Sequence, residues 1–291
     1  MLFKKISVLF MICCLVFAKA NAQFNLDGAT LIIQPNASVT AKGDVIVNTD
    51  LQGTGKFILN GTAVQNVNMN GHDVPNIEVN NSANINLTGN VKVSGNVSFT
   101  AGSILLGNFN LQLGNTGTVS NASNAGFFVT NGGGTLVKSA LGTTAFTYPV
   151  GNTINTYNPV SITNTGTADD IAVKCFTNVY SGGLTGSTLT SKYVDASWNV
   201  NEAVAGGSNF SITPSWYVAD ELPGFDRTKI KLVAYNTGTG IWDTANVATG
   251  AASGANPYSF TRTGITAPGT FAVGTFTVAS SPSVTSASTA S

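Results

Sequence analysis

A short apolar pattern between Asn76 and Val119 constrains the fold of this chain more than any other sequence feature. Pairs of apolar residues, usually separated by one residue, recur every six to eight residues. They are Ile77-x-Val79, Ile85-x-Leu87, Val91-x-Val93, Val97-x-Phe99, Ile104-Leu105 and Leu111-x-Leu113. Three pairs span about 20 residues, which aligns Ile77 with Val97, Ile85 with Leu105 and Val91 with Leu111. This period predicts a parallel β-helix with three short strands in every rung.

Gly-Asn pairs punctuate the same region, at Gly89-Asn90, Gly95-Asn96, Gly107-Asn108 and Gly114-Asn115. Both residue types tolerate left-handed backbone conformations, so we expect them at the corners of the solenoid. Asn side chains stacked on successive rungs are expected to hydrogen-bond from one rung to the next. The looser alternation over residues 27–74 predicts earlier, irregular rungs together with an N-terminal cap.

Composition changes sharply along the chain. All three Trp and all seven Tyr lie after residue 147, whereas residues 23–134 contain neither and hold 20 Asn. We therefore expect an all-β protein with a parallel β-helix over 23–140 and an antiparallel β-sandwich over 141–279, the latter inferred from longer, turn-separated strand patterns. Residues 280–291 form a Ser/Thr-rich segment that is expected to be a disordered tail or linker.

The first 22 residues have the features of an export signal. Lys4 and Lys5 precede the apolar run Ile6–Phe17, and Ala20-Asn-Ala22 fits a cleavage site. The chain expected after cleavage carries ten basic and thirteen acidic residues, and this excess of acids argues against nucleic acid as a partner. We also expect no transmembrane segment in that chain. Cys175 is then the single cysteine, and its alternation with Ile171 and Val173 predicts a packed side chain.

Two sets of motifs resemble known secreted proteins. The first set is Gly55–Gly61, Asn76–Asn81 and Gly107–Leu113, and the second is Phe128–Gly132, Tyr148–Gly151, Tyr157–Val160, Gly224–Arg227 and Thr261–Ile265. The first resembles the β-solenoid segments of large adhesin-like surface proteins of the Bacteroidetes, and the second resembles the module that follows them. The resemblance implies cargo of type IX secretion, a route that reads a C-terminal sorting domain, but supplies no catalytic residues. Residues 281–291 look like a linker instead, so either the chain is a fragment or export ends after the signal-peptide step.

Catalysis requires a specific arrangement of acids. Glycoside hydrolysis uses two carboxylates about 5–9 Å apart, and parallel β-helices do host enzymes that degrade polysaccharides. The acids of the expected solenoid are Asp27, Asp44, Asp50, Asp73 and Glu78, all scattered at turns, and the regular rungs after Glu78 contain no acid. We therefore expect no enzymatic activity. His72, the sole histidine, lies in a turn-like string and cannot form a zinc site alone.

One acidic loop is a candidate calcium site. Asp220, Glu221 and Asp226 offer three carboxylates within seven residues, and calcium takes six to eight oxygen ligands. Arg227 and Lys229 adjoin the loop and could pair with the same acids, which is the alternative interpretation.

Aromatic residues of the second half suggest a carbohydrate-binding alternative, because flat rings stack on sugar faces. Strand parity places Phe210, Ile212, Trp216 and Val218 on one face and Tyr217 on the other. Trp216 is thus expected inside, while Trp242 and Tyr217 are the candidate ligand-binding residues. Core packing is the competing interpretation of these rings.

The sequence as a whole predicts an exported, non-enzymatic structural or adhesive module that is extracellular or at the cell surface, with the periplasm as a further possible compartment. Glycans or other envelope proteins are the expected partners. A carbohydrate-binding protein that uses the sandwich aromatics is the first alternative, and a polysaccharide lyase or hydrolase built on the β-helix is the second.

Overall fold

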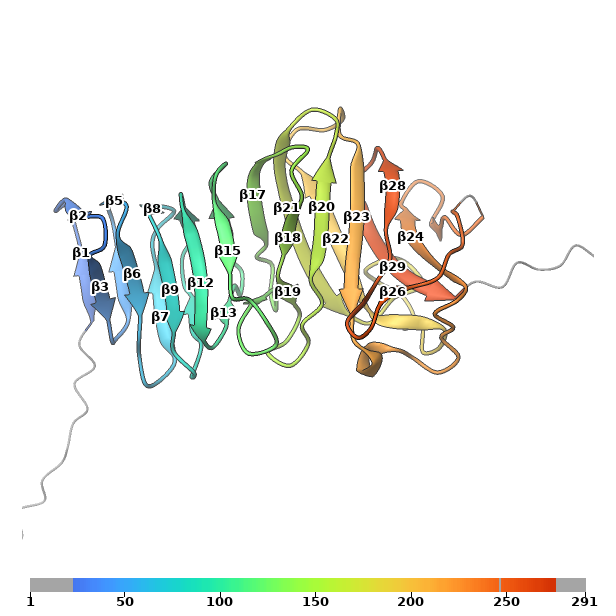
Figure 1. Cartoon of the computed structure of the whole chain (residues 1–291), viewed down its shortest axis with the longest axis horizontal. Coiled ribbons are helices and arrows are strands. Elements are labelled where there is room, and N and C mark those ends of the chain that lie inside the picture. The colour runs from blue at the N-terminus through green and yellow to red at the C-terminus, as the bar shows by residue number, and fades with distance from the viewer. Residues whose placement is uncertain (1–22, 246, 276–291) are drawn as a thin grey trace, which may run out of the picture.

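The computed structural model describes residues 23–245 and 247–275. The expected signal peptide (1–22) and the expected tail (280–291) lie outside the described residues. The described chain is all-β: it contains strands β1 to β29 and one 3-10 helix, η1 (Val218–Asp220). Figure 1 shows an elongated molecule in which the strands succeed one another along the long axis from the N-terminal end.

The N-terminal half is a parallel β-solenoid of about six turns, as the apolar period predicted. Its strands form three faces, which we number in chain order. Face 1 consists of β1 (Phe24–Leu26), β4 (Val45–Val47), β7 (Gln65–Asn68), β10 (Ile85–Leu87), β13 (Ile104–Leu105), β16 (Phe128–Val129) and β19 (Val150–Gly151). Face 2 consists of β2 (Leu31–Ile33), β5 (Leu51–Gly53), β8 (Asp73–Val74), β11 (Val91–Val93), β14 (Leu111–Leu113) and β17 (Leu136–Leu141). Face 3 consists of β3 (Ser38–Ala41), β6 (Lys56–Leu59), β9 (Ile77–Asn80), β12 (Asn96–Ala101) and β15 (Thr118–Ser120).

The register confirms two of the three expected alignments. Ile77 pairs with Val97, and Val91 pairs with Leu111. The expected pairing of Ile85 with Leu105 is wrong by one residue, because Ile85 lies beside Ile104. Strand β12 has a register shift between Phe99 and Ala101, and the turn after it has two residues where the rung below has four. Ile104 therefore points into the core, where it is 1% exposed.

The expected N-terminal cap over residues 27–74 is wrong for the described residues. Strands β1, β2 and β3 pair in parallel with β4, β5 and β6, so the chain from Phe24 already forms a rung rather than a cap. The register offsets of 21, 20 and 18 residues agree with the looser spacing expected there. Within the described chain, β1, β2 and β3 each form the outer edge of their sheet.

The C-terminal half consists of antiparallel strands, and one of its two sheets continues face 2 of the solenoid without a break. One sheet extends face 2 from β17 through β21 (Asp169–Thr177), β22 (Tyr193–Glu202), β29 (Gly269–Thr275), β24 (Ile230–Asn236) and β25 (Ile241–Trp242). The other contains β18 (Phe146–Tyr148), β20 (Val160–Asn164), β23 (Phe210–Trp216), β27 (Tyr258–Ser259) and β26 (Ser253–Gly254), with β28 (Arg262–Ile265) also paired to β23. Strand β17 crosses residue 140 and β19 still pairs with β16 in parallel, so the division into domains at 140/141 stays a prediction.

Core positions in this half follow strand parity where the strands persist. Phe210, Ile212 and Trp216 are fully buried, and Cys175 is buried as predicted. Val218 was expected on the same inner face, yet its side chain is 46% exposed. Strand β23 ends at Trp216 and Val218 begins η1, so the two-residue alternation no longer applies to it.

Two lysine side chains donate hydrogen bonds to backbone carbonyls at the junction between the two halves. Lys138 stands at the register position of Leu113, and its Nζ donates to the carbonyls of Gly114 (2.6 Å) and Asn115 (2.5 Å). Lys174 of β21 donates in the same way to the carbonyl of Gly132. Burial lowers the pKa of Lys138, against an opposing attraction from Asp170. Lys138 thus bonds to carbonyls at the corner between β14 and β15, where face 3 ends, and Lys174 bonds to one at the corner between β16 and β17.

Candidate binding surface

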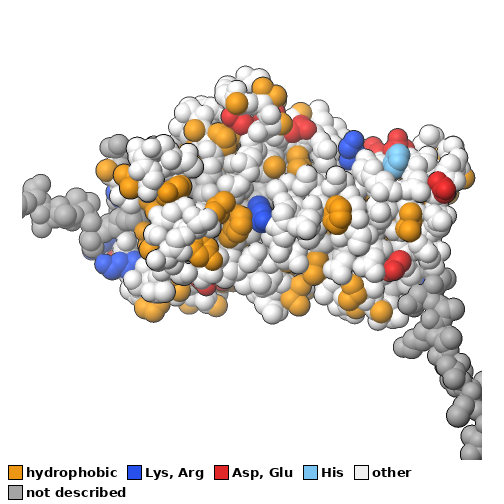
Figure 2. All heavy atoms as spheres, turned by 180° about the vertical axis from the view of Figure 1, so that it is seen from behind, with side chains coloured by type: hydrophobic (Ala, Val, Ile, Leu, Met, Phe, Trp, Pro, Cys, Tyr) orange, Lys and Arg blue, Asp and Glu red, His pale blue; other side chains and the backbone are white. Residues whose placement is uncertain are grey.

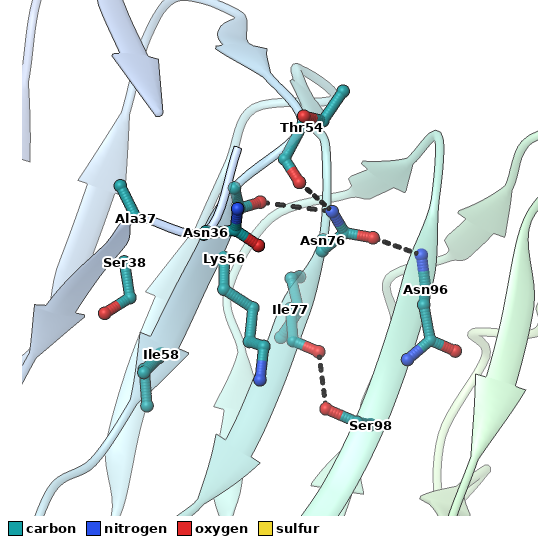
Figure 3. A pocket seen from close by; sticks show the side chains of 11 residues that line it. Asn36, Ala37, Ser38, Thr54, Lys56, Ile58, Asn76, Ile77, Asn96 and Ser98 are labelled. Carbon is teal, nitrogen blue, oxygen red and sulfur yellow. Dashed lines mark hydrogen bonds between the residues drawn. The ribbon is translucent and has the colours of Figure 1, made fainter. Parts of the chain in front are cut away.

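The outer surface of the solenoid is built from side chains that bond between rungs. Asn76 donates from Nδ2 to the carbonyls of Thr54 (2.9 Å) and Gly55 (3.1 Å), and its Oδ1 accepts the N–H of Asn96 at 2.8 Å (Figure 3). A side-chain oxygen also accepts a backbone N–H of the next rung in the pairs Asp44–Asn66, Asp50–Asp73, Asn84–Ser103, Asn90–Asn110 and Asn110–Thr135. The expected bonding of Asn side chains from rung to rung is confirmed.

These hydrogen bonds between rungs give a reason for the corner glycines that differs from the left-handed backbone conformation suggested by the sequence. Of the four Gly-Asn pairs, only Gly107 has a positive φ, at 55°. A Cβ on Gly95 would lie 2.4 Å from both Asn76 Oδ1 and the carbonyl oxygen of Pro75, and one on Gly89 would lie 1.8 Å from Asn68 Oδ1. Glycine is required at Gly89 because Asn68 of the preceding rung occupies the space of a side chain, and at Gly95 because Asn76 and the Pro75 carbonyl oxygen together occupy it.

A groove of about 400 Å³ crosses these rungs on face 3 and at its corner with face 2. Its lining comes from four successive rungs, and Figure 3 shows Asn76 near its centre. The lining residues are Asn36, Ala37, Ser38, Thr54, Gly55, Lys56, Ile58, Asn76, Ile77, Asn96 and Ser98. The groove thus offers hydroxyls, amides and one ammonium group on a rigid floor, and Ile58 as an apolar contact.

Lys56, the charged residue in the lining of the groove, forms an ion pair with Glu78. Lys56 Nζ lies 2.8 Å from Glu78 Oε2, and the Thr100 hydroxyl donates to Glu78 Oε1 at 3.2 Å. These two hydrogen bonds, the one from Lys56 being the stronger, lower the pKa of Glu78. Glu78 therefore stays ionised at neutral pH and acts as a hydrogen-bond acceptor, since a general acid would need a raised pKa.

Face 2 brings together residues that looked scattered in the sequence. His72 Nδ1 lies 3.0 Å from Asp50 Oδ1, the Asp73 N–H donates to the same oxygen at 2.9 Å, and Lys92 pairs in register with Asp73. Figure 2 shows the histidine, in pale blue, beside acidic side chains. The N–H of Asp73 and then the His72 ring lower the pKa of Asp50. Sequence reasoning missed this cluster, although Asp50, Asp73 and Lys92 are separated by one rung length each.

The calcium candidates each have partners within the chain. Asp220 accepts hydrogen bonds from Asn158 (2.9 Å) and from the Tyr217 N–H (2.9 Å), and burial raises its pKa. Glu221 forms a two-pronged ion pair with Arg227, with both contacts at 2.7 Å, and Asp226 accepts from Thr228. Pairing of this loop with Arg227 is thus present. Among the described residues no group of three or more His, Cys, Asp or Glu is placed to hold a metal ion, and calcium binding here stays a prediction.

The two aromatic candidates, Trp242 and Tyr217, are both half-buried. Trp242 is half-buried, donates from Nε1 to the carbonyl of Tyr180 at 3.0 Å and meets Tyr235 edge-on at 5.5 Å between ring centroids. It packs against Val179, Val233 and Ala272. Tyr217 lies just after β23 and is also half-buried. Their role in ligand binding stays a prediction.

Comparison with known proteins gave no match to a family model, to a curated protein or to a solved structure. A search of the described residues for a helix long and apolar enough to span a membrane found none.

Proposed function

We propose that this protein is an exported, non-enzymatic structural or adhesive module of the cell surface or extracellular space. The observation that carries the proposal is the regular solenoid, whose outward polar side chains bond to neighbouring rungs rather than converge on one point. With rungs about 4.8 Å apart, six rungs make a rod about 25–30 Å long. Such a rod spaces and displays contacts, and weak contacts repeated along it gain strength by avidity.

The polar groups of the groove support binding more than chemistry. Asn76 uses its amide N–H groups and its carbonyl oxygen in the rung ladder, and Glu78 is engaged by Lys56. The groups left to a partner are the hydroxyls of Ser38 and Thr54 and the amide of Asn36, beside the Lys56 ammonium. A polar chain such as a glycan, or a segment of an envelope protein, matches this lining. The resemblance to adhesin-like surface proteins of the Bacteroidetes points the same way.

We further propose that the antiparallel half is a β-sandwich over residues 141–279. Support comes from Tyr148 of β18 and Ile171 of β21, which belong to different sheets yet are both fully buried and in contact, because the Tyr148 hydroxyl donates to the Ile171 carbonyl at 3.0 Å. In a sandwich, residues of the two inner faces share one core in this way. Deuterium exchange of the intact protein tests the idea, since both sheets should exchange as one cooperative unit.

A glycan array with paired variants tests the adhesive function. Ser98→Trp fills the groove, whereas Asn86→Trp places the same ring on face 1, at an outward position of β10 that does not line the groove. We expect multivalent display of the protein to bind a subset of polar glycans or envelope extracts, and Ser98→Trp alone to reduce that binding at least tenfold. Equal binding by both variants would remove the groove from the proposal.

The two alternative functions have their own readouts. Binding that survives Ser98→Trp but is lost in Trp242→Ala or Tyr217→Ala would favour the carbohydrate-binding protein that uses sandwich aromatics. Release of unsaturated or reducing sugars from acidic or neutral polysaccharides would favour the lyase or hydrolase and refute the non-enzymatic proposal.

A further inference from the structure

The N-terminal end of the solenoid exposes three strand edges at once. Within the described residues, β1, β2 and β3 have a neighbour on one side only. The N–H of Phe24 and the carbonyls of Leu26, Ile33, Ala37 and Ala41 all bond to the second rung. Because alternate residues of a parallel strand bond to opposite neighbours, the backbone groups of Asn25, Ile32, Ser38 and Thr40 point away from the rod. They form a ring of open donors and acceptors.

Apolar side chains fill the centre of this ring. Phe24, Leu26, Leu31 and Val39 pack on the core from the first rung, yet they are only half-buried because no rung covers them. The equivalent positions one rung further, Val45, Val47, Leu51 and Phe57, are at most 4% exposed. The end is thus a cross-section of the core with hydrogen-bonding groups around it.

These edges lack the features that keep free strands from pairing. Natural edge strands are protected by charged residues, prolines or bulges. Strands β1, β2 and β3 contain no charged residue and no proline, and Ile32 is 51% exposed at the edge. Asp27 and Lys42 are the two charged residues of the first rung, so two such ends do not carry a like-charge excess.

After cleavage at the expected signal site, the exported chain retains no N-terminal segment that covers this end. Cleavage after Ala22, which is part of the proposed function, leaves Gln23 as the one residue before β1. A cover must then come from another molecule, and a second N-terminal end supplies the same apolar centre and the same open backbone groups. Since the chain winds in the same sense in both copies, strands that meet end to end run antiparallel and can pair, as a two-fold interface requires.

We propose that the mature protein forms a closed dimer through its N-terminal ends, in which β1, β2 and β3 of two copies pair antiparallel. The dimer is a rod of twice the length with the two C-terminal halves at its outer ends. Each copy then presents its groove in a pair, which deepens the proposed adhesive role by making the smallest assembly bivalent.

Sedimentation analysis of residues 23–291 tests the interface directly. We expect twice the chain mass at micromolar concentration. The variant Asn25→Pro/Ile32→Lys removes one open N–H and places a charge on a second edge, and it should raise the dissociation constant at least tenfold. The control Asn25→Ala/Gln52→Lys keeps that N–H and moves the charge to the residue in register with Ile32 one rung inward, so it should dimerise like wild type.

Hydrogen exchange keeps the test valid if the edge variant unfolds. Wild-type peptides covering residues 23–41 should exchange more slowly as concentration rises, while peptides covering 104–120 should not change. A single-chain mass at about 100 μM, masses that grow beyond two copies, or exchange independent of concentration would each overturn the dimer. N-terminal sequencing of the secreted protein separately tests cleavage before Gln23, so a failed export model is distinguished from a failed interface.

Discussion

The corner glycine Gly89 gives a sharp test of how the rungs fit together. Its φ lies outside the left-handed region, so alanine can adopt its backbone conformation without strain. The obstacle is a single atom group, because the new Cβ would lie 1.8 Å from Asn68 Oδ1 and 2.7 Å from Asn68 Cγ. The next nearest atom is the Asn70 nitrogen, at 3.3 Å. Removing the Asn68 side chain should therefore remove most of the clash.

The expected energies follow from these contacts. Asn68→Ala loses the bond from the Asn70 N–H to Asn68 Oδ1 (2.9 Å, solvent-exposed), which costs about 1 kcal/mol. Gly89→Ala forces Asn68 out of that position, which loses the same bond and adds about 1 kcal/mol of rotamer strain, or about 2 kcal/mol in total. In the double variant the clash is absent, and alanine lowers the entropy of the unfolded chain by an equivalent of about 0.5 kcal/mol. We expect the double variant to cost about 0.5–1 kcal/mol, some 2 kcal/mol less than the sum of the single changes.

Urea unfolding of the four proteins, followed by tryptophan fluorescence and circular dichroism, measures this coupling. The pair Gly95→Ala and Asn76→Ala is the control, because a Cβ on Gly95 also meets the backbone oxygen of Pro75 at 2.4 Å. Removing the Asn76 side chain cannot relieve that contact, so rescue should be much smaller there. Additive energies for Gly89 and Asn68, or equal rescue in both pairs, would refute the explanation from close packing of the ladder.

Three further perturbations test other parts of the molecule. Lys138→Met should destabilise the protein by about 1–3 kcal/mol, because the carbonyls of Gly114 and Asn115 lose their charged donor. Calorimetry measures this loss, and an unchanged midpoint of thermal unfolding would show that water replaces the ammonium group. Phe57→Ala should cost about 3–5 kcal/mol, since the ring is fully buried between rungs, and a cost under about 1 kcal/mol would mean that the solenoid interior is loosely packed. The pKa of Glu78 is lowered below its ordinary value of 4.5 in the folded state, so its contribution to stability is present above that value and is lost as pH falls through the folded pKa. Urea midpoints between pH 6 and pH 3 should therefore fall more steeply for wild type than for Glu78→Gln, and parallel curves would contradict the ion pair.

The sequence predicts the solenoid well because apolar spacing depends only on local geometry. Alignments across one rung, such as Ile77 with Val97, need no knowledge of turns. The alignment of Ile85 with Leu105 failed because a bulge in β12 and a shortened turn change the count within one rung, and neither has a clear sequence signal. The prediction that Val218 lies inside failed for a similar reason. The two-residue alternation holds only within a strand, and β23 ends at Trp216, before Val218.

The surface was harder to predict than the core. The Gly-Asn pairs suggest left-handed conformations, whereas Gly89 is required by Asn68 one rung earlier and Gly95 by both Asn76 and the Pro75 carbonyl. Asp50, Asp73 and Lys92 follow the rung spacing as well, but outward charged residues lack the apolar period that makes this spacing visible in the sequence. The role of Lys138 has no such signal, because it depends on where the regular stack stops and on which corner carbonyls then lie within reach of its ammonium group.

The unbroken sheet from β17 into β21 has a mechanical consequence. Backbone hydrogen bonds of the solenoid run parallel to its long axis, and β17, β21 and β22 extend the same series into the C-terminal half. Tension applied between the two ends of the long axis therefore acts on successive layers in series, and no flexible linker between β17 and β21 relieves it. Under tension the fold should break first at its weakest layer, after which strands should detach one at a time while the remaining layers stay folded.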